Sequence, residues 1–548
     1  MSAAASHRGA SGDSAPGDAL RGDSEPGTTG PDPTALSGGR GGPAALRPLL
    51  ATVLAALEAG AARRGGPLAP GDPAVLADQV AQAFRAVARA DPAAPHADPA
   101  TVAGEWGAGS PEALAELTEL LAHGAADPAD PAGAAHLHCP PLAVAVAAGL
   151  AAAALNPSLD SWDQAPAATV LERELLAELA QLVGYRPERA AGVLTSGGTE
   201  SNLLGLMLAR DQLLGGQPEL DGVDLSRRPR ILASRVAHFS VQRAAALLGL
   251  GERSVVPVAV DRDQRMDPAA LARALAEVRG TGGTPIALVA TAGTTDTGAV
   301  DPLRDCARLA QEYGAWLHVD AAYGGGALLS RRLAPLLDGI ALADSVSLDW
   351  HKLGWQPVAA GVFLVRRAET YASLARRAVY LNPADDEKAG YPSLLGYSLR
   401  TTRRADAFKI AVTLRTLGRA GLGELVDRCH ALAGFAAGAV EARPALELHA
   451  EPLLTTVLFR CLPGDAATRS DPAAVDRFNA VLRRRLLAEG RAVLGRTELP
   501  APEGEVTAGL VRLKLTLLNP HTTEADVERL LDEVVRTGRR IEQEGPGQ

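Results

Sequence analysis

Short apolar runs alternate with helical patterns through the middle third of the chain. Between these runs, apolar residues recur at helical spacing, for example over 203–208 and from about 239 to 248. This alternation predicts an α/β fold with a mainly parallel sheet and helices on both faces. The runs that have the composition and length of buried strands are 192–195, 230–234, 285–291, 316–320, 345–349 and 361–365.

One helix between these strands carries signals at both of its ends. Asp301 is the expected N-cap and Pro302 the expected first helical residue. Gly314 is the expected stop, because glycine readily takes the left-handed conformation that ends helices.

The first part of the chain has a different pattern. Residues 1–42 are rich in Gly, Ser, Pro and Asp and hold almost no large apolar side chains, which predicts disorder. Leucines at helical spacing from Leu46 to Leu57 then begin a helical segment. With proline breaks, this segment is expected to continue to about residue 142.

The last 150 residues predict a smaller α+β unit. Helices are expected over 403–420 and 423–441, and strands over 455–460 and 510–517. Residues 522–526 then open a C-terminal helix with a threonine N-cap and an acidic first turn.

The composition is that of a soluble globular protein. The 548 residues are 47% hydrophobic and 22% charged, with a formal net charge of −10. Such a chain is too long for one simple core, so two or three domains are expected. The acidic balance argues against nucleic acid or an anionic membrane as the main partner.

The cysteines and the apolar runs indicate the compartment. Cys139, Cys306, Cys429 and Cys461 form no CxxC pair or metal-ligand spacing, which favours the reducing cytoplasm. No secretory signal is evident at the N-terminus. The longest apolar run, 142–155, is shorter than the roughly 20 residues that span a bilayer. It is therefore expected to be a buried Ala-rich helix, with no membrane segment.

Polar motifs follow the predicted strands. Because the carboxyl ends of parallel strands meet at one edge of a sheet, side chains in these motifs are expected to lie together. The motifs are residues 196–202 (SGGTESN), 237–240 (AHFS), 292–298 (AGTTDTG), 320–324 (DAAYG) and 349–352 (DWHK).

Lys352 is the most informative residue of these motifs. Alone, a lysine after a strand is more often an ordinary surface residue. Lysine is, however, the side chain that forms an exchangeable Schiff base with the aldehyde of pyridoxal 5'-phosphate (PLP). With the neighbouring motifs, Lys352 is predicted to carry PLP, and Asp349 to belong to the same site. His351 is expected to contact the phosphate or catalytic groups.

Asp320 is predicted to pair with the protonated pyridine nitrogen of PLP. A buried carboxylate there favours the charged ring, which then acts as an electron sink for a carbanion. The alternative is an aspartate that merely caps a turn. The small Ala322 favours the cofactor role, because it lets the ring lie close to the backbone.

The remaining cofactor contacts are predicted from the other motifs. Gly197, Gly198 and Thr199 between a strand and a helix suit a phosphate dianion. His238 is expected to stack on the ring face opposite the sheet, although a lone histidine is more often a plain structural residue. Thr295 is expected to hydrogen-bond the ring oxygen or the substrate carboxylate.

Together these motifs resemble the group II PLP-dependent amino acid decarboxylases. The resemblance runs from about residue 135 to 519, and its most specific pieces are 318–324 (HVDAAYG) and 349–352. Residues 136–140, 160–169 and 401–407 look most like the bacterial L-2,4-diaminobutyrate decarboxylase branch. The resemblance implies PLP fold type I, the aspartate-aminotransferase-like fold, and a homodimer with active sites at the subunit interface.

The chain is accordingly expected to have four parts. They are a disordered tail (1–42), a helical N-terminal dimerisation segment (43–142), a large PLP-binding domain (143–421) and a small C-terminal α+β domain (422–548).

In the family that the chain resembles, a mobile loop supplies a tyrosine that protonates the carbanion. The matching stretch is about 380–398, which contains Tyr380, Tyr391 and Tyr397. Tyr391 is the predicted proton donor, from the number of residues that separate it from Arg403 and Arg404. The polar, small residues just before it suit a lid that moves.

Substrate choice is predicted from Trp162 and Asp163, which match the substrate pocket of family members. A carboxylate there would pair with a distal ammonium and favour diaminobutyrate, ornithine or lysine. Asp163 could instead cap the helix that begins near Pro166. An aromatic substrate, a carbon–carbon lyase reaction and an oxidative decarboxylation on the same fold stay open. A non-catalytic role is disfavoured, because Lys352, Asp320 and His238 are all present.

Overall fold

The computed structural model describes residues 34–86, 112–215, 217–375, 378–499 and 510–544. The predicted disordered tail lies outside these residues as far as residue 33, and helix α1 already begins at Gly42.

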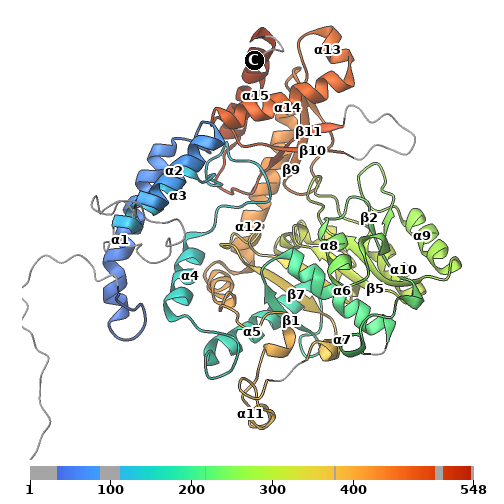
Figure 1. Cartoon of the computed structure of the whole chain (residues 1–548). Coiled ribbons are helices and arrows are strands. Elements are labelled where there is room, and N and C mark those ends of the chain that lie inside the picture. The colour runs from blue at the N-terminus through green and yellow to red at the C-terminus, as the bar shows by residue number, and fades with distance from the viewer. Residues whose placement is uncertain (1–33, 87–111, 216, 376–377, 500–509, 545–548) are drawn as a thin grey trace, which may run out of the picture.

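A seven-stranded sheet forms the core of the large lower part of the molecule in Figure 1. Its strand order is β1-β7-β6-β5-β4-β2-β3, and β7 alone runs antiparallel to its neighbours. All six predicted strands are confirmed to within one residue. The strands are β1 (Ala191–Thr195), β2 (Pro229–Ser234), β3 (Val255–Val258), β4 (Thr284–Thr291), β5 (Trp316–Ala321), β6 (Ser345–Asp349) and β7 (Gly361–Val365).

Helices cover both faces of this sheet, as predicted. On β4, Leu288 and Ala290 join the core cluster on one face, while Ala287 and Val289 join the cluster on the other. Both faces are thus buried, which explains why β4 is an almost continuous apolar run. The helices of this part are α5 (Pro166–Val183), α6 (Gly198–Leu214), α7 (Pro218–Asp221), α8 (Ser240–Leu247), α9 (Pro268–Gly280), α10 (Leu303–Tyr313) and α11 (Ala384–Lys388). Short 3₁₀ turns lie at Leu225–Arg227, Glu252–Ser254, Gly324–Leu329, Ala334–Leu337, Ile340–Leu342, Ala368–Ser373 and Leu395–Tyr397.

The predicted start of helix α10 is wrong. The helix begins at Leu303 with Pro302 as its N-cap. The carboxylate of Asp301 points into the core instead, where it accepts the backbone N–H groups of Thr291 and Met266, both at 2.7 Å. Burial raises the pKa of Asp301 to about 6. The predicted stop at Gly314 is confirmed, with φ +65°.

Helix α12 (Ala407–Glu441) joins the sheet to the C-terminal part. Two helices, 403–420 and 423–441, were expected, but the chain continues through a single non-helical residue, Gly418, with φ +66°. Residues up to Cys429 pack in the core of the large sheet, and residues from Leu432 onward pack in the C-terminal core. The domain boundary after residue 421 stays a prediction, and α12 runs across it.

The C-terminal part is the α+β unit that its pattern indicates. An antiparallel sheet in the order β10-β11-β9-β8 packs against helices. Thr523 and Asp526 cap the last helix reciprocally, through bonds of 2.9 and 3.2 Å. The elements are β8 (Leu446–Leu448), β9 (Thr456–Cys461), α13 (Ala466–Ser470), α14 (Pro472–Ala488), β10 (Gly495–Glu498), β11 (Val511–Thr516) and α15 (Glu524–Glu544).

The N-terminal helices are α1 (Gly42–Arg64), α2 (Pro73–Ala86) and α3 (Glu112–Gly124). The chain from 125 to 142 is not helical, so the helical segment ends earlier than predicted. By length and composition alone, α1 would be able to cross a bilayer, and it is the single such helix in the described part of the chain.

Helix α4 (Ala143–Leu155) is buried on one face only, which corrects the expectation of a buried helix. Its alanine face, with Ala145, Ala148 and Ala152, packs inward. Val146, which lies off this face, and Leu155, the last residue of the helix, are exposed. The alanine-rich composition reflects close packing of one face rather than enclosure of the whole helix.

A buried ion pair joins α5 to the segment before α12. Arg403 donates to both carboxylate oxygens of Glu172, at 2.7 and 2.9 Å, and the two side chains are 3% and 0% exposed. Burial raises the pKa of Glu172, and the arginine opposes that shift. This pairing also explains why α12 starts later than predicted, since Arg403 is turned toward α5.

Arg403→Met is expected to destabilise the fold by about 3–5 kcal/mol, because it leaves the Glu172 carboxylate buried without its cation. The free energy of unfolding in urea measures this. Arg332→Met is the matched control, because the Arg332–Asp427 pair is 53% and 39% exposed and should contribute under about 1 kcal/mol. Equal losses in the two variants would contradict the assignment.

Candidate active site

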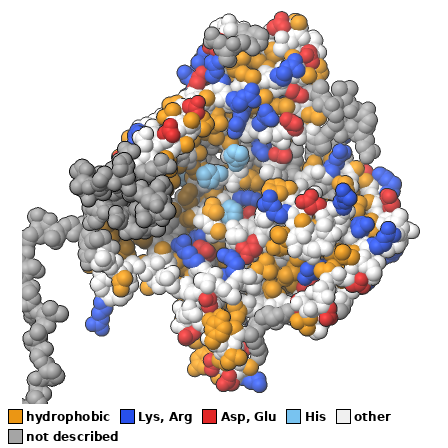
Figure 2. Space-filling view, in the orientation of Figure 1, with side chains coloured by type: hydrophobic (Ala, Val, Ile, Leu, Met, Phe, Trp, Pro, Cys, Tyr) orange, Lys and Arg blue, Asp and Glu red, His pale blue; other side chains and the backbone are white. Residues whose placement is uncertain are grey.

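A cavity of about 470 Å³ opens at the carboxyl edge of the parallel strands. Figure 2 shows histidine side chains gathered in a hollow between the C-terminal part and the large sheet. The structure brings all ten predicted cofactor residues to the lining of this cavity: Gly197, Gly198, Thr199, His238, Thr295, Asp320, Ala322, Asp349, His351 and Lys352.

The turn after β1 has a conformation that requires glycine. Gly197 has φ +152° and ψ −176°, a region that is essentially restricted to glycine. A Cβ on Gly198 would lie 3.0 Å from the Ala322 Cβ and 3.3 Å from Asp349 Oδ2. The first backbone N–H groups of α6 therefore face the cavity without side chains in the way, which suits an anion.

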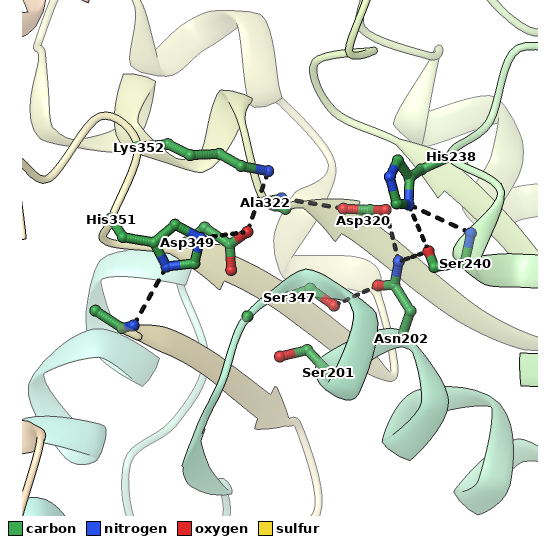
Figure 3. A network of polar contacts seen from close by, with 12 residues as sticks. Ser201, Asn202, His238, Ser240, Asp320, Ala322, Ser347, Asp349, His351 and Lys352 are labelled. Carbon is green, nitrogen blue, oxygen red and sulfur yellow. Dashed lines mark hydrogen bonds and ion pairs between the residues drawn. The ribbon is translucent and has the colours of Figure 1, made fainter. Parts of the chain in front are cut away.

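Lys352 lies just beyond β6, within a short polar cluster (Figure 3). Its Nζ is 3.1 Å from Asp349 Oδ2, and His351 Nε2 is 3.5 Å from the same oxygen. His351 Nδ1 accepts the backbone N–H of Ala360 at 3.2 Å, so a neutral ring carries its proton on Nε2. Burial lowers the pKa of His351 and thereby favours this neutral form.

Asp320, at the end of β5, is buried and receives two donors. Its Oδ1 accepts the backbone N–H of Ala322 at 3.1 Å, and its Oδ2 accepts the amide of Asn202 at 2.7 Å. These two bonds fix the orientation of the carboxylate. The side chain is thus prepared to accept a further proton-bearing group from the cavity.

His238 follows β2 on the other side of the cavity. Its Nδ1 lies 2.9 Å from the Ser240 hydroxyl, which also accepts from the Asn202 amide at 2.9 Å. Burial lowers the pKa of His238, which favours the neutral imidazole. A neutral, oriented ring is suited to pack against a flat aromatic ligand.

Behind Asp320 lies His318, which is completely buried and which the sequence reading gave no role. Burial lowers the pKa of His318 to about 4, whereas an unfolded histidine titrates near 6.5. Between pH 6.5 and 4 the unfolded chain therefore binds a proton that the folded chain does not. Stability is lost as pH falls through this window.

The expected size of this His318 effect is on the order of 3 kcal/mol between pH 6.5 and 4. Unfolding in urea at several pH values, for the wild type and for His318→Gln, measures it. The variant should lose stability less steeply as the pH falls, whatever its absolute stability. Parallel pH profiles for the two proteins would contradict the assignment.

Lys514 and His136 are among the further cavity residues that had no predicted role. Lys514 reaches in from β11, where its Nζ donates to Asp296 Oδ1 at 2.9 Å and to the Thr295 carbonyl at 3.2 Å. His136 also lines the cavity and has an uncommon positive φ of 62°. The signal for Lys514 was a charged residue within the apolar run 510–517.

Trp162, Asp163 and Tyr391 are not among the residues that line this cavity. Tyr391 is 48% exposed, and its ring centroid lies 6.0 Å from that of Trp162. Asp163 accepts the Ser161 hydroxyl at 2.5 Å and does not cap α5, whose N-cap is Ala165. The predicted proton donor and substrate residues therefore form a cluster of their own on this chain.

The cavity fits PLP by its unused polar atoms as well as by its shape. Asp349 Oδ1 and Thr291 Oγ1 are buried and have no hydrogen-bond partner within the described part of the chain. Buried polar atoms of this kind are normally satisfied, so they indicate a bound polar ligand. A glycine-lined anion site, a lysine and a carboxylate around one cavity match the phosphate, aldehyde and pyridine nitrogen of PLP.

Comparison with known proteins gives consistent relatives. Residues 112–462 match the family model described as "Pyridoxal-dependent decarboxylase conserved domain". The L-2,4-diaminobutyrate decarboxylase of Rhizobium meliloti is 43% identical over 80% of this chain and 84% of its own length. The enzyme of the same name from Acinetobacter baumannii is 38% identical over 79% of this chain and 85% of its own length.

A solved structure extends the similarity to the fold. It is the glutamate decarboxylase domain of diaminobutyrate-pyruvate transaminase and L-2,4-diaminobutyrate decarboxylase from Vibrio parahaemolyticus. It is 33% identical, covers 92% of this chain and 98% of its own length, and has a TM-score of 0.77. The family model covers well over half of the chain, and both curated relatives exceed 30% identity over most of their length. The chain therefore belongs to the pyridoxal-dependent decarboxylases, with PLP as cofactor and an amino acid as substrate.

Proposed function

We propose that this decarboxylase acts on L-2,4-diaminobutyrate and releases propane-1,3-diamine and CO₂. The observation that carries the choice of substrate is the similarity to two enzymes of that name over four-fifths of the chain. The cavity supports the reaction class, because a lysine, a carboxylate and a glycine turn at a helix N-terminus converge in it.

Each side of the cavity has a distinct task in this proposal. Lys352 holds the cofactor aldehyde, and Asp320 accepts the pyridine N–H. The turn of Gly197, Gly198 and Thr199 binds the phosphate, and His238 packs on the ring. PLP supplies the electron sink that lets the Cα–carboxylate bond break.

Lys514 gives the cavity a fixed cation near Thr295. Its side chain is 7% exposed, and its bonds to Asp296 and the Thr295 carbonyl fix its position. A substrate carboxylate that enters this cavity meets a positioned ammonium group, and such charge-assisted bonds are strong. The ammonium thus orients the bond that breaks.

We further propose a cytoplasmic homodimer in which Trp162, Asp163 and Tyr391 serve the cavity of the second copy. They lie apart from the cavity of their own chain, and Tyr391 is half exposed. The apolar side chains of Val146 and Leu155, exposed on α4, supply surface that a second copy would bury. Asp163 then meets the distal ammonium, and Tyr391 supplies the proton that takes the place of the lost carboxylate at Cα.

A substrate panel tests the proposed function. Purified PLP-loaded protein is offered diaminobutyrate, ornithine, lysine, tyrosine, tryptophan and glutamate, and the products are measured by mass spectrometry. Diaminobutyrate should give the highest kcat/KM, by about 10-fold or more over lysine. A higher kcat/KM for tyrosine or tryptophan would contradict the proposal that diaminobutyrate is the substrate. An aldehyde with ammonia or peroxide in place of the amine would overturn simple decarboxylation.

Hybrid dimers test the shared site. Lys352→Ala and Tyr391→Phe are each expected to be impaired alone. Co-expressed, they should regain activity if Tyr391 acts across the interface, because one of the two cavities is then intact. If Tyr391 serves its own chain, both cavities of the hybrid are defective and no activity returns.

A further inference from the structure

The Asn202 side chain, on α6, is a hub between the two sides of the cavity (Figure 3). Its amide nitrogen donates to Asp320 Oδ2 at 2.7 Å and to the Ser240 hydroxyl at 2.9 Å. Its oxygen accepts from the Ser347 hydroxyl at 2.7 Å and lies 2.9 Å from His318 Nε2. The Asn202 side chain is 1% exposed, and the partners named here are all protein side chains.

The orientation of this amide follows from Asp320. An ionised carboxylate can only accept hydrogen bonds, so the nitrogen of Asn202 must face it. The oxygen of Asn202 then faces His318, so the proton of that ring must be on Nε2. His318 is thereby required to accept at Nδ1.

The far end of the chain of hydrogen bonds requires the same direction. Trp316 Nε1 can only donate, and it lies 2.8 Å from the Ser345 hydroxyl. That hydroxyl lies 2.8 Å from His318 Nδ1 and has its own proton to donate there. Asp320, which can only accept, and Trp316, which can only donate, therefore require the same direction of donation along the chain of hydrogen bonds.

The position of these residues explains why they meet. Alternate residues of β5 (Trp316, His318 and Asp320) share a face with alternate residues of β6, and His318 is paired in register with Ser345. Helix α6 lies over this face. A Cβ on its Gly205 would be 2.6 Å from His318 Nδ1, so the helix leaves room for the ring only because residue 205 is glycine.

We propose that Asn202 and His318 are positioning residues that hold Asp320 ionised and aimed at the cofactor. The Asn202 relay, as we name it, runs from Trp316 through Ser345, His318 and Asn202 to Asp320. The same amide also fixes the tautomer of His238. The Ser240 hydroxyl accepts from Asn202 and donates to His238 Nδ1, so the neutral ring of His238 carries its proton on Nε2. This inference rests on the proposed pairing of Asp320 with PLP.

The relay makes a distant hydroxyl matter to the cofactor. Without Ser345, His318 is free to carry its proton on Nδ1, and its bare Nε2 then faces the oxygen of Asn202. Relief of that repulsion turns the amide over and places an oxygen against Asp320. Two acceptors at that distance favour protonation of Asp320, which removes the anionic partner of the pyridine ring.

A matched pair of serine variants tests the relay. Ser345→Ala and Ser201→Ala each remove a hydroxyl from a side chain that is 0% exposed. Ser201 bonds to Thr195 at 2.7 Å and lies outside the relay. PLP affinity is measured on the apoprotein, and the absorbance of the bound cofactor is titrated against pH. Ser345→Ala should weaken PLP binding by about 5-fold and move the titration midpoint, whereas Ser201→Ala should do neither.

Asn202→Leu breaks the relay next to Asp320 and should weaken PLP binding by about 10- to 100-fold. His318→Leu should also weaken PLP binding. His318→Gln keeps an N–H near the Asn202 oxygen, so its loss of PLP affinity should be smaller than that of His318→Leu. The melting temperature of each apoprotein separates damage to the fold from damage to the site. If Asn202→Leu does not fold, the comparison of Ser345→Ala with Ser201→Ala still tests the relay.

Two results are decisive against the relay. Equal behaviour of Ser345→Ala and Ser201→Ala in both measurements overturns it. The relay is also overturned if the cofactor absorbance of Asn202→Leu titrates with the wild-type midpoint while that of Asp320→Asn has a shifted midpoint. If Asp320→Asn also leaves the affinity and the midpoint unchanged, the proposed pairing of Asp320 with PLP fails, and the relay fails with it.

Discussion

Lys352→Arg lowers the rate of decarboxylation by about 10³-fold or more, as does Lys352→Ala. Arginine keeps a cation beside Asp349, where the lysine Nζ now lies 3.1 Å from Oδ2, but it cannot bond covalently to an aldehyde. Comparison of the two variants therefore separates the covalent role of Lys352 from its charge.

The measurement for Lys352 is amine formation together with the visible absorbance of the bound cofactor. Both variants should lose the absorbance band of the lysine-bound aldehyde, while their melting temperatures stay near that of the wild-type apoprotein. A Lys352→Arg enzyme that kept a tenth of wild-type activity would show that the lysine acts by charge alone.

Asp320→Asn should lower kcat by about 10²- to 10³-fold, because a neutral amide cannot hold the pyridine ring in its protonated form. The substitution preserves the shape of the side chain. It removes one of the two carboxylate oxygens, of which Oδ2 accepts from the Asn202 amide at 2.7 Å. Single-turnover rates with saturating PLP measure the chemical step separately from cofactor loss. Asp320→Glu, which keeps the charge, should be less impaired.

Activity of Asp320→Asn within 10-fold of wild type would contradict the electron-sink role of the ring–carboxylate pair. An effect on KM with kcat unchanged would also contradict it, because that pattern reports substrate binding rather than the chemical step.

The strands of the large sheet were predictable because both of their faces are buried, which leaves short runs rich in apolar residues, such as β4 and β7, between polar turns. β3 was missed because it is a four-residue edge strand that contains Pro257. Asp301 was misassigned for a tertiary reason. It carries the sequence signal of an N-cap, but two backbone N–H groups from other elements compete for its carboxylate.

The cofactor residues were predictable from topology, since each follows a strand and those strands end at one edge. Lys514 and His136 come from outside that edge, and their approach depends on how the C-terminal part packs against the sheet. Trp162 and Tyr391 follow none of the strands that end at that edge, and they lie outside the lining of the cavity of their own chain.

The Asn202 relay had a sequence signal that is clear once β5 and β6 are paired. Trp316, His318 and Asp320 alternate on one strand, while Ser345, Ser347 and Asp349 alternate on the next. Polar residues at every second position of a buried strand indicate an internal network. The direction of that network still required the contacts of Asn202, which belongs to a different element.

Borohydride reduction of the PLP-loaded protein, followed by peptide mass spectrometry, is the most direct test that this cavity is a PLP site. Reduction fixes the cofactor to the lysine that carries it. The chain has four lysines: Lys352, Lys388, Lys409 and Lys514. The predicted result is a label on Lys352 alone. A label on Lys409 or Lys514, or none on Lys352, would contradict the account.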